Sequence, residues 1–228
     1  MPYPEPAPRG IPLLLQAPLV RAVLAGAKTE TRRLIQSVPW SADQAQHQAF
    51  HQLAFGLGRD PEIGVLPWCP YGQLGDLLWV RETWRAEERP DGLDGVRYRA
   101  DEAFESIANT REAAERWLEA YRGDERWRPS IHMPRWASRL TLRLTDVRVE
   151  RLQEITNEGV LAEGLGFVWG YTRAEPPRDG RARFAEFWNE LYSDPKRSWQ
   201  ADPWVWVLGF EALHANINAV IAEDHSAE

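Results

Sequence analysis

The chain has 228 residues, of which 43% are hydrophobic and 27% are charged, and this composition excludes global disorder. A chain of this length can bury a core without metal or disulfide cross-links. Its one cysteine, Cys69, excludes an internal disulfide and a zinc site built from cysteines, so the cytoplasm is the expected compartment. The sequence shows neither an apolar run of membrane-spanning length nor a secretory signal pattern, and no membrane partner is expected.

The net charge of −7 disfavours tight, sequence-independent binding to duplex nucleic acid, which requires many Lys and Arg residues. A local basic cleft could still bind a single strand, and a small nucleoside needs no basic surface. The twelve tryptophans either fill the core or, at a few positions, line a pocket for a flat ligand, because indole rings stack on bases.

Periodicity and turn residues predict the elements in chain order. After a flexible arm over residues 1–10, patterns typical of strands cover 11–16, 77–85, 96–99, 139–151 and 203–211. Patterns typical of helices cover 18–27, 101–121, 156–165, 182–192 and 212–222. A change of phase near Asp146 predicts a β-bulge, and Thr156 is expected to cap the helix that follows it. Strands and helices do not alternate regularly, which favours an α+β fold.

The densest polar motif is Gly-Ala-Lys-Thr-Glu-Thr-Arg-Arg, from Gly26 to Arg33, where the first predicted helix ends. In an extended segment Thr31 and Arg33 share one side, and a sharp turn after Lys28 would bring its amine near Thr31. A partly desolvated lysine loses its proton more easily and can then activate a hydroxyl. The alternative is a basic helix cap whose arginines are solvated.

Glu82 and Trp84 lie on a face of the predicted strand 77–85 that is otherwise apolar. A carboxylate on such a face must be paired or must contact a ligand. Pairing with Arg33 or Arg139 is one interpretation. The other is that Glu82 accepts a hydrogen bond from a cytosine amino group while Trp84 stacks on the ring.

A third group, Arg135, Trp136 and Arg139, precedes the long central strand. These residues either pack where the chain enters that strand, or they form the basic and aromatic edge of the same cleft.

The spacing of Gly26, Lys28, Thr31 and Arg33 resembles the Gly-x-Lys-x-x-(acidic or hydroxyl)-x-Arg signature of the ASCH domain family, in the PUA-like superfamily. Three further segments resemble that family in the same order: GDLLWVRETW from residue 75, PSIHMPRWASR from residue 129, and PWVWV from residue 203. The second of these is similar to a segment of the larger, phage-associated members.

This resemblance implies a mixed β-barrel with surrounding helices. It covers residues 11–211 as a single domain, with insertions at about 36–75 and 86–135, followed by a C-terminal helix or tail over 212–228. The insertions make the chain about twice as long as the small members of the family, and they bear on which substrate it accepts.

Some small ASCH proteins hydrolyse the acetyl amide of N4-acetylcytidine with a Lys, a Thr three residues later and a Glu in a later helix. The resemblance places these roles on Lys28, Thr31 and Glu163, with Glu158 as the second choice for the Glu. It implies that Thr31 attacks the acyl carbonyl, Lys28 takes its proton and Glu163 protonates the leaving amine. Arg33 or backbone N–H groups would stabilise the oxyanion.

The expected function is therefore amide hydrolysis at an N4-acylated cytosine nucleoside. The alternatives are a non-catalytic module that binds RNA or a modified base, and a ribonuclease that uses Lys28. The expected partner is a modified nucleoside or single-stranded RNA. No metal or cofactor is expected, because His47 and His51 have helical metal spacing but no third ligand in an obvious place.

Overall fold

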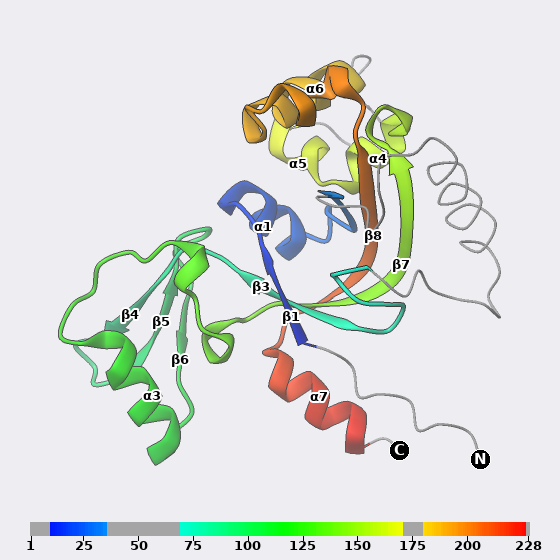
Figure 1. Cartoon of the computed structure of the whole chain (residues 1–228). Coiled ribbons are helices and arrows are strands. Elements are labelled where there is room, and N and C mark those ends of the chain that lie inside the picture. The colour runs from blue at the N-terminus through cyan, green and yellow to red at the C-terminus, as the bar shows by residue number, and fades with distance from the viewer. Residues whose placement is uncertain (1–9, 36–68, 171–179, 227–228) are drawn as a thin grey trace, which may run out of the picture.

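The computed structural model describes residues 10–35, 69–170 and 180–226 (Figure 1). The predicted arm, except its last residue, lies outside the described residues, as do His47, His51 and most of the predicted insertion at 36–75. Within the described segments, no helix has the length and hydrophobicity that crossing a membrane requires.

Five strands form the main sheet in the order β1-β3-β7-β8-β2. β1 (Gly10–Leu14) runs parallel to β3 (Leu77–Arg81), and every other neighbouring pair is antiparallel. β7 (Thr141–Arg151) and β8 (Trp204–Leu213) pair along almost their whole length, and β2 (Glu30–Leu34) lies beside β8 at the edge. The predicted bulge is confirmed, since the register of β7 shifts between Leu144 and Asp146.

Helices and sheets occur together without regular alternation, so the predicted α+β class is confirmed, but a closed barrel is not found. β1 and β2 are the two edges of the main sheet, and no backbone ladder joins them among the described residues. A side chain spans this gap instead, because Arg33 Nη2 donates to the carbonyl oxygen of Leu14 at 3.0 Å. On the edge of β2 that faces away from β8, the backbone N–H of Arg32 likewise donates to a side chain, that of Glu163, rather than to another strand.

The predicted strand over 77–85 is divided between two sheets. After β3 the chain leaves the main sheet and continues as β4 (Trp84–Glu88), which pairs with β5 (Asp94–Tyr98) as the predicted hairpin partner. β6 (Phe104–Ser106) completes this second sheet of three strands. We refer to residues 84–137, which include this sheet, as the lobe; Figure 1 shows it to one side of the main sheet.

The predicted helix over 101–121 is wrong in its first half. The helix α3 (Arg111–Tyr121) begins only after Thr110, whose hydroxyl accepts from the N–H of Ala113 at 3.2 Å. Asp101, predicted to be the cap, instead accepts from Ala103 N–H and from Arg139. Pairing of β6 with β5 outweighs the helical periodicity of this segment.

Four further helices are grouped together beside the main sheet. α1 (Ala17–Leu24) follows β1, and α4 (Asn157–Ala162), α5 (Leu165–Trp169) and α6 (Gly180–Leu191) pack near it, as Figure 1 shows. The predicted cap of α4 is confirmed, because Thr156 accepts from the N–H of Gly159 at 3.1 Å. α5 was not predicted, and α7 (Ile217–Ser226) begins later than predicted because β8 continues to Leu213.

Gly164 between α4 and α5 is the position where close packing most needs a glycine. Its φ is +79°, and a Cβ there would lie 2.8 Å from the Cβ atoms of Ala22 and Lys28. We expect Gly164→Ala to lower the free energy of unfolding by about 2–4 kcal/mol, from left-handed strain together with the clash. Urea denaturation measures this change.

The matched control is Gly170→Ala. Gly170 has a φ of +77°, and among the described residues no heavy atom lies within 4 Å of its ideal Cβ, so this variant carries the backbone strain alone. Equal losses of stability in the two variants would contradict the packing argument.

Candidate active site around Lys28 and Glu163

The candidate site lies where the segment after α1 meets the end of α4. Gly26, with a φ of +66°, turns the chain out of α1, and Lys28 then forms an isolated β-bridge with Glu163. The N–H of Thr29 donates to the carbonyl oxygen of Ala162 at 2.8 Å. These backbone contacts bring together two segments that are 135 residues apart in the sequence.

Lys28 is buried, with 1% of its surface exposed, and its amine has three acceptors. Nζ lies 2.6 Å from Glu163 Oε2, 2.7 Å from the carbonyl oxygen of Glu30 and 2.9 Å from that of Glu163. An ammonium group has three hydrogens, so each can be donated to a protein oxygen. Burial lowers the pKa of Lys28 below its ordinary 10.5, although Glu163 acts in the opposite direction.

Glu163 is held through both carboxylate oxygens. Oε2 pairs with Lys28, and Oε1 accepts from the backbone N–H of Arg32 at 2.6 Å. Glu163 is the C-cap residue of α4, at the end of the helix on which it was predicted, and it is buried. Glu158, the second choice, is exposed in the first turn of α4. The structure therefore brings Glu163, and not Glu158, to Lys28.

Thr31 and Arg33 lie on the same side of β2, as predicted for an extended segment. Arg33 Nη1 donates to Thr31 Oγ1 at 3.0 Å, and Thr31 is buried with 1% exposed surface. The guanidinium is thus placed to stabilise negative charge that develops on the hydroxyl oxygen.

Arg32, on the other side of β2, was not predicted as a site residue, yet it supports Glu163. Its buried guanidinium donates to Glu30 at 2.9 Å and to Glu150 at 3.2 Å. Arg148 joins the same network through Glu30, Glu150 and Asp146. A cavity of about 310 Å³ borders this network. The alternation of charged residues along β2 was the only feature of the sequence that could have indicated a role for Arg32. It could not indicate that the backbone N–H of Arg32 would bind Glu163.

Tyr71 and Tyr192 were also missed as neighbours of the site. Burial raises the pKa of both phenols, and the positive charge of Arg33 acts on both in the opposite direction. The charge of Glu163 also acts on Tyr192. Tyr192 was predicted only as part of the apolar face of a helix, and Tyr71 lies in a segment without any clear pattern.

Glu82 and Arg139 form a buried ion pair away from Lys28. Arg139 donates to both carboxylate oxygens of Glu82, at 2.9 and 3.0 Å, and to both oxygens of Asp101, each at 2.9 Å. Burial raises the pKa of Glu82, and Arg139 opposes that change. Of the two interpretations of Glu82, the structure shows the pairing with Arg139.

Trp84, Trp136 and Arg135 also lie away from Lys28. Trp84 is buried in the lobe core and has 1% exposed surface. Trp136 meets it edge to face, with ring centroids 6.0 Å apart. Arg135 packs its guanidinium against Gly10 of β1. The predicted single cleft is therefore divided: Lys28 contacts Glu163, Thr31 contacts Arg33 on the adjoining β2, and the other predicted residues gather at the lobe.

In the part of the chain that the structure describes, no group of three or more His, Cys, Asp or Glu side chains is placed to hold a metal ion. No protein-family model, no curated protein and no solved structure matches the chain. The ASCH resemblance therefore stays a prediction that rests on the sequence motifs.

The geometry at Glu82 predicts a structural role that stability measurements can test. We expect Glu82→Ala to lower the free energy of unfolding by about 3 kcal/mol or more, because it leaves part of the buried Arg139 charge uncompensated. Chemical denaturation measures the change. The control is Glu115→Ala on α3, whose partner Arg111 has a side chain that is 92% exposed, and it should have no measurable effect. A loss at Glu82 no larger than that of the control would contradict this role.

Proposed function

We propose that the chain hydrolyses the acyl amide of an N4-acylated cytosine nucleoside, with Thr31 as nucleophile, Lys28 as general base and Glu163 as general acid. The observation that carries this proposal is the buried contact between Lys28 Nζ and Glu163 Oε2 at 2.6 Å. Of the residues that the ASCH resemblance groups, Lys28 and Glu163 are in direct contact, and the buried Thr31 follows Lys28 by three residues in the sequence. The insertions leave the identity of the acyl group and the size of the substrate open.

The first step requires a neutral amine on Lys28. Burial favours that form, and the short hydrogen bond gives the proton a path to Glu163, which converts the ion pair into an amine and a carboxylic acid. The amine can then take the proton of Thr31 as Oγ1 forms a bond to the acyl carbon. Arg33 or backbone N–H groups stabilise the oxyanion.

In the second step the bond from the acyl carbon to N4 breaks. Glu163 gives its proton to the departing nitrogen, and cytidine leaves with a free amino group. The acyl group is then an ester of Thr31. Water hydrolyses that ester, the carboxylic acid departs, and the hydroxyl of Thr31 regains its proton. Each proton transfer contributes on the order of 10²–10⁴ in rate.

A second candidate function, a binding module for a modified base or RNA, is favoured by one observation. The three hydrogens of the Lys28 ammonium are matched by three protein acceptors, and Thr31 is buried. Such an arrangement also suits a structural ion pair that shapes a base-binding surface without taking part in chemistry.

Turnover of N4-acetylcytidine by variants separates these functions. We expect Lys28→Ala, Thr31→Val and Glu163→Gln each to reduce kcat by about 10³ or more, and the double variant Lys28→Ala/Glu163→Gln to be no slower than the singles, because the residues act as a unit. Chromatographic detection of cytidine measures the rates. The control is Glu158→Gln, a conservative change of an exposed residue on the same helix, which should retain wild-type turnover.

Substrate binding that persists without turnover, in the wild type and in Lys28→Ala alike, would contradict the hydrolase and favour the binding module. Cleavage of single-stranded RNA that is lost in Lys28→Ala would favour the ribonuclease.

The pH dependence of kcat/KM tests the role of Lys28 separately. The reactive form of the pair, a neutral Lys28 beside a protonated Glu163, holds one proton in all, so kcat/KM should fall as pH rises through the pKa of Lys28, which burial places below 10.5. The charge of Arg33 helps to lower this pKa, so Arg33→Gln should raise it and move the falling limb to higher pH. Arg143→Gln, which removes an ion pair with Asp224 on α7, should leave the limb in place. A limb that Arg33→Gln does not move, or moves to lower pH, would contradict the assignment of the base.

A further inference from the structure

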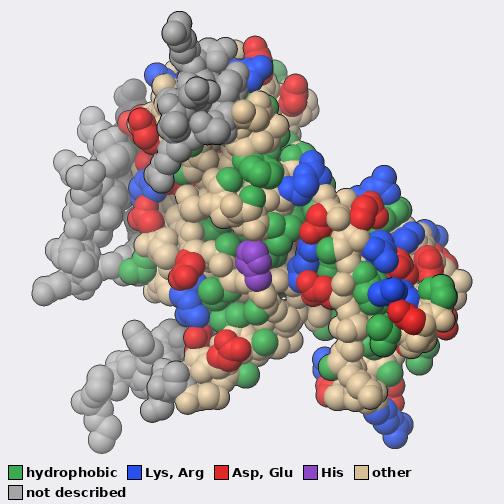
Figure 2. All heavy atoms as spheres, turned by 180° about the vertical axis from the view of Figure 1, so that it is seen from behind, with side chains coloured by type: hydrophobic (Ala, Val, Ile, Leu, Met, Phe, Trp, Pro, Cys, Tyr) green, Lys and Arg blue, Asp and Glu red, His purple; other side chains and the backbone are tan. Residues whose placement is uncertain are grey.

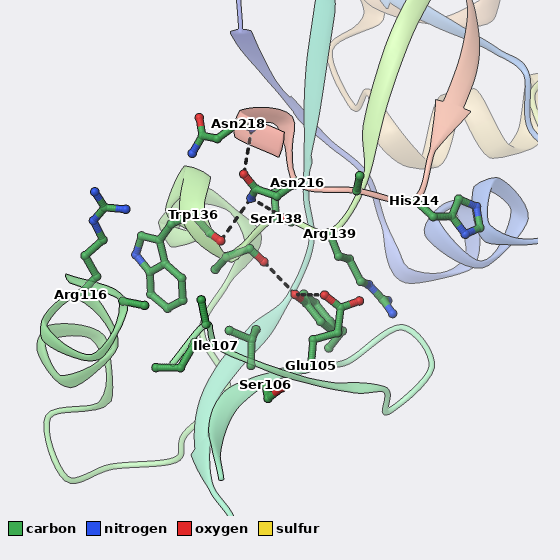
Figure 3. A pocket seen from close by; sticks show the side chains of 16 residues that line it. Glu105, Ser106, Ile107, Arg116, Trp136, Ser138, Arg139, His214, Asn216 and Asn218 are labelled. Atoms are coloured by element: carbon green, nitrogen blue, oxygen red, sulfur yellow. Dashed lines mark hydrogen bonds between the residues drawn. The ribbon is translucent and has the colours of Figure 1, made fainter. Parts of the chain in front are cut away.

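A separate cavity of about 330 Å³ lies where the lobe meets the start of α7 (Figure 3). Its lining comes from β5, the segment 105–108, α3, residues 136–139 and residues 214–218, and it contains none of the four residues of the Lys28 site. Thr31 pairs with Leu208 in β8, and the cavity lining begins at His214, six residues further on. At about 3.3 Å per strand residue, the two sites are separated by roughly 20 Å.

Trp136 forms a wall of this cavity, and the turn that carries it is fixed from two sides. Asn216 Nδ2 lies 2.9, 3.2 and 2.7 Å from the carbonyl oxygens of the first, second and fourth residues of the turn 135–138. The hydroxyl of Tyr98 donates to the carbonyl oxygen of the third at 3.0 Å. The indole ring also packs edge to face on Trp84. A flat, half-buried aromatic wall is therefore in place before any ligand arrives.

The remaining lining combines an apolar floor with charged groups at the rim. Figure 3 shows Trp136 between Arg116 of α3 on one side and Ile107 and Glu105 on the other. Arg116 pairs with Glu112 on the same helix, but both side chains are at least half exposed, so this pair is weak and open to exchange. Glu105 is exposed, and its one hydrogen-bond partner in the described part of the chain is the hydroxyl of Tyr98 at 3.4 Å, whose single proton the carbonyl oxygen of Ala137 accepts at the shorter distance of 3.0 Å.

Charges around the cavity are local rather than spread over a basic surface. Figure 2 shows acidic and basic side chains interspersed over the lobe. A ligand here is therefore recognised by a few placed groups and by stacking, not by a broad electrostatic field.

We propose that this cavity binds a nucleobase with an exocyclic amino group, cytosine or adenine, that carries a phosphate. The base stacks on Trp136, its amino group donates to the carboxylate of Glu105, and its phosphate pairs with Arg116. The volume is sufficient for one such base. The same chemistry is offered by a free nucleotide and by one nucleotide of a single-stranded RNA.

The proposal is tested by titrating the full chain with cytidine, adenosine and uridine 5′-monophosphates and with ribose 5-phosphate. The indole N–H resonance of Trp136, identified by its loss in Trp136→Leu, reports binding at this site, and calorimetry gives Kd. The cytidine and adenosine nucleotides should shift this resonance saturably, and uridine 5′-monophosphate and ribose 5-phosphate should bind more weakly. Trp136→Leu should weaken the binding of cytidine 5′-monophosphate by roughly tenfold or more.

Three matched variants separate the contacts. Glu105→Gln should remove the preference over uridine 5′-monophosphate, and Arg116→Gln should weaken binding of the nucleotide more than binding of cytidine. Glu112→Gln, which releases Arg116 from its partner, should leave nucleotide binding as tight or tighter. Lys28→Ala should leave Kd unchanged. The Glu105 and Arg116 variants alter exposed side chains, so they keep the test open if Trp136→Leu does not fold.

A hexacytidylate strand distinguishes the two sources of the base. Binding tighter than that of cytidine 5′-monophosphate, weakened by Trp136→Leu, indicates RNA, and equal binding indicates a free nucleotide. The proposal is overturned if neither the nucleotides nor the strand shift the Trp136 resonance, if Glu105→Gln and Arg116→Gln both bind like the wild type, or if Lys28→Ala weakens binding as much as Arg116→Gln does.

Discussion

A lysine and a glutamate that are both removed from solvent can share a site only if nearly every polar atom of the two finds a partner, because each ion loses its hydration. Lys28 and Glu163 meet this condition with three acceptors for the amine and two donors for the carboxylate. Several of these partners are backbone groups, so the ion pair is satisfied only when the segment after α1, β2 and the end of α4 lie in one arrangement. The pair is therefore a constraint on the backbone as much as a chemical group.

The two sides of β2 carry different groups of polar side chains next to this ion pair. Thr31 and Arg33 share one side, and Glu30 and Arg32 share the other, where they connect with Glu150 and Arg148. Pairing with β8 sets this register, and a slip of one residue would exchange the two sides. The Arg32 N–H that binds Glu163 is at the edge of the sheet. Because no further strand pairs with the described part of β2 on that side, this N–H is available to the Glu163 carboxylate.

The sequence predicted those features that depend on local chemistry. The cap at Thr156, the bulge at Asp146 and the alternation in β2 follow from residue type and spacing, whereas the choice of Lys28, Thr31 and Glu163 came from the ASCH resemblance. The features that were missed depend on distant contacts. Helical periodicity from residue 101 was overridden by pairing of β6 with β5, and the strand over 77–85 divides at Glu82, whose carboxylate pairs with Arg139. Alternation of side chains along the predicted strand 77–85 also cannot show that its two halves enter different sheets. For this reason the residues predicted to line one cleft lie in two separate groups.

The division at Glu82 also explains why the lobe can hold a cavity of fixed shape. Glu82 precedes β4, Asp101 follows β5, and Arg139 begins the return to the main sheet, so their ion pairs join the points where the chain enters and leaves the lobe. Asn216 then ties the adjoining turn to the chain before α7. Because the cavity lies between these two connections, a change that loosens the ion cluster should disturb Trp136 without reaching Lys28. The Lys28 site and the cavity beside Trp136 thus depend on different buried charges. A substitution in one site can therefore be compared with the unchanged other site of the same protein.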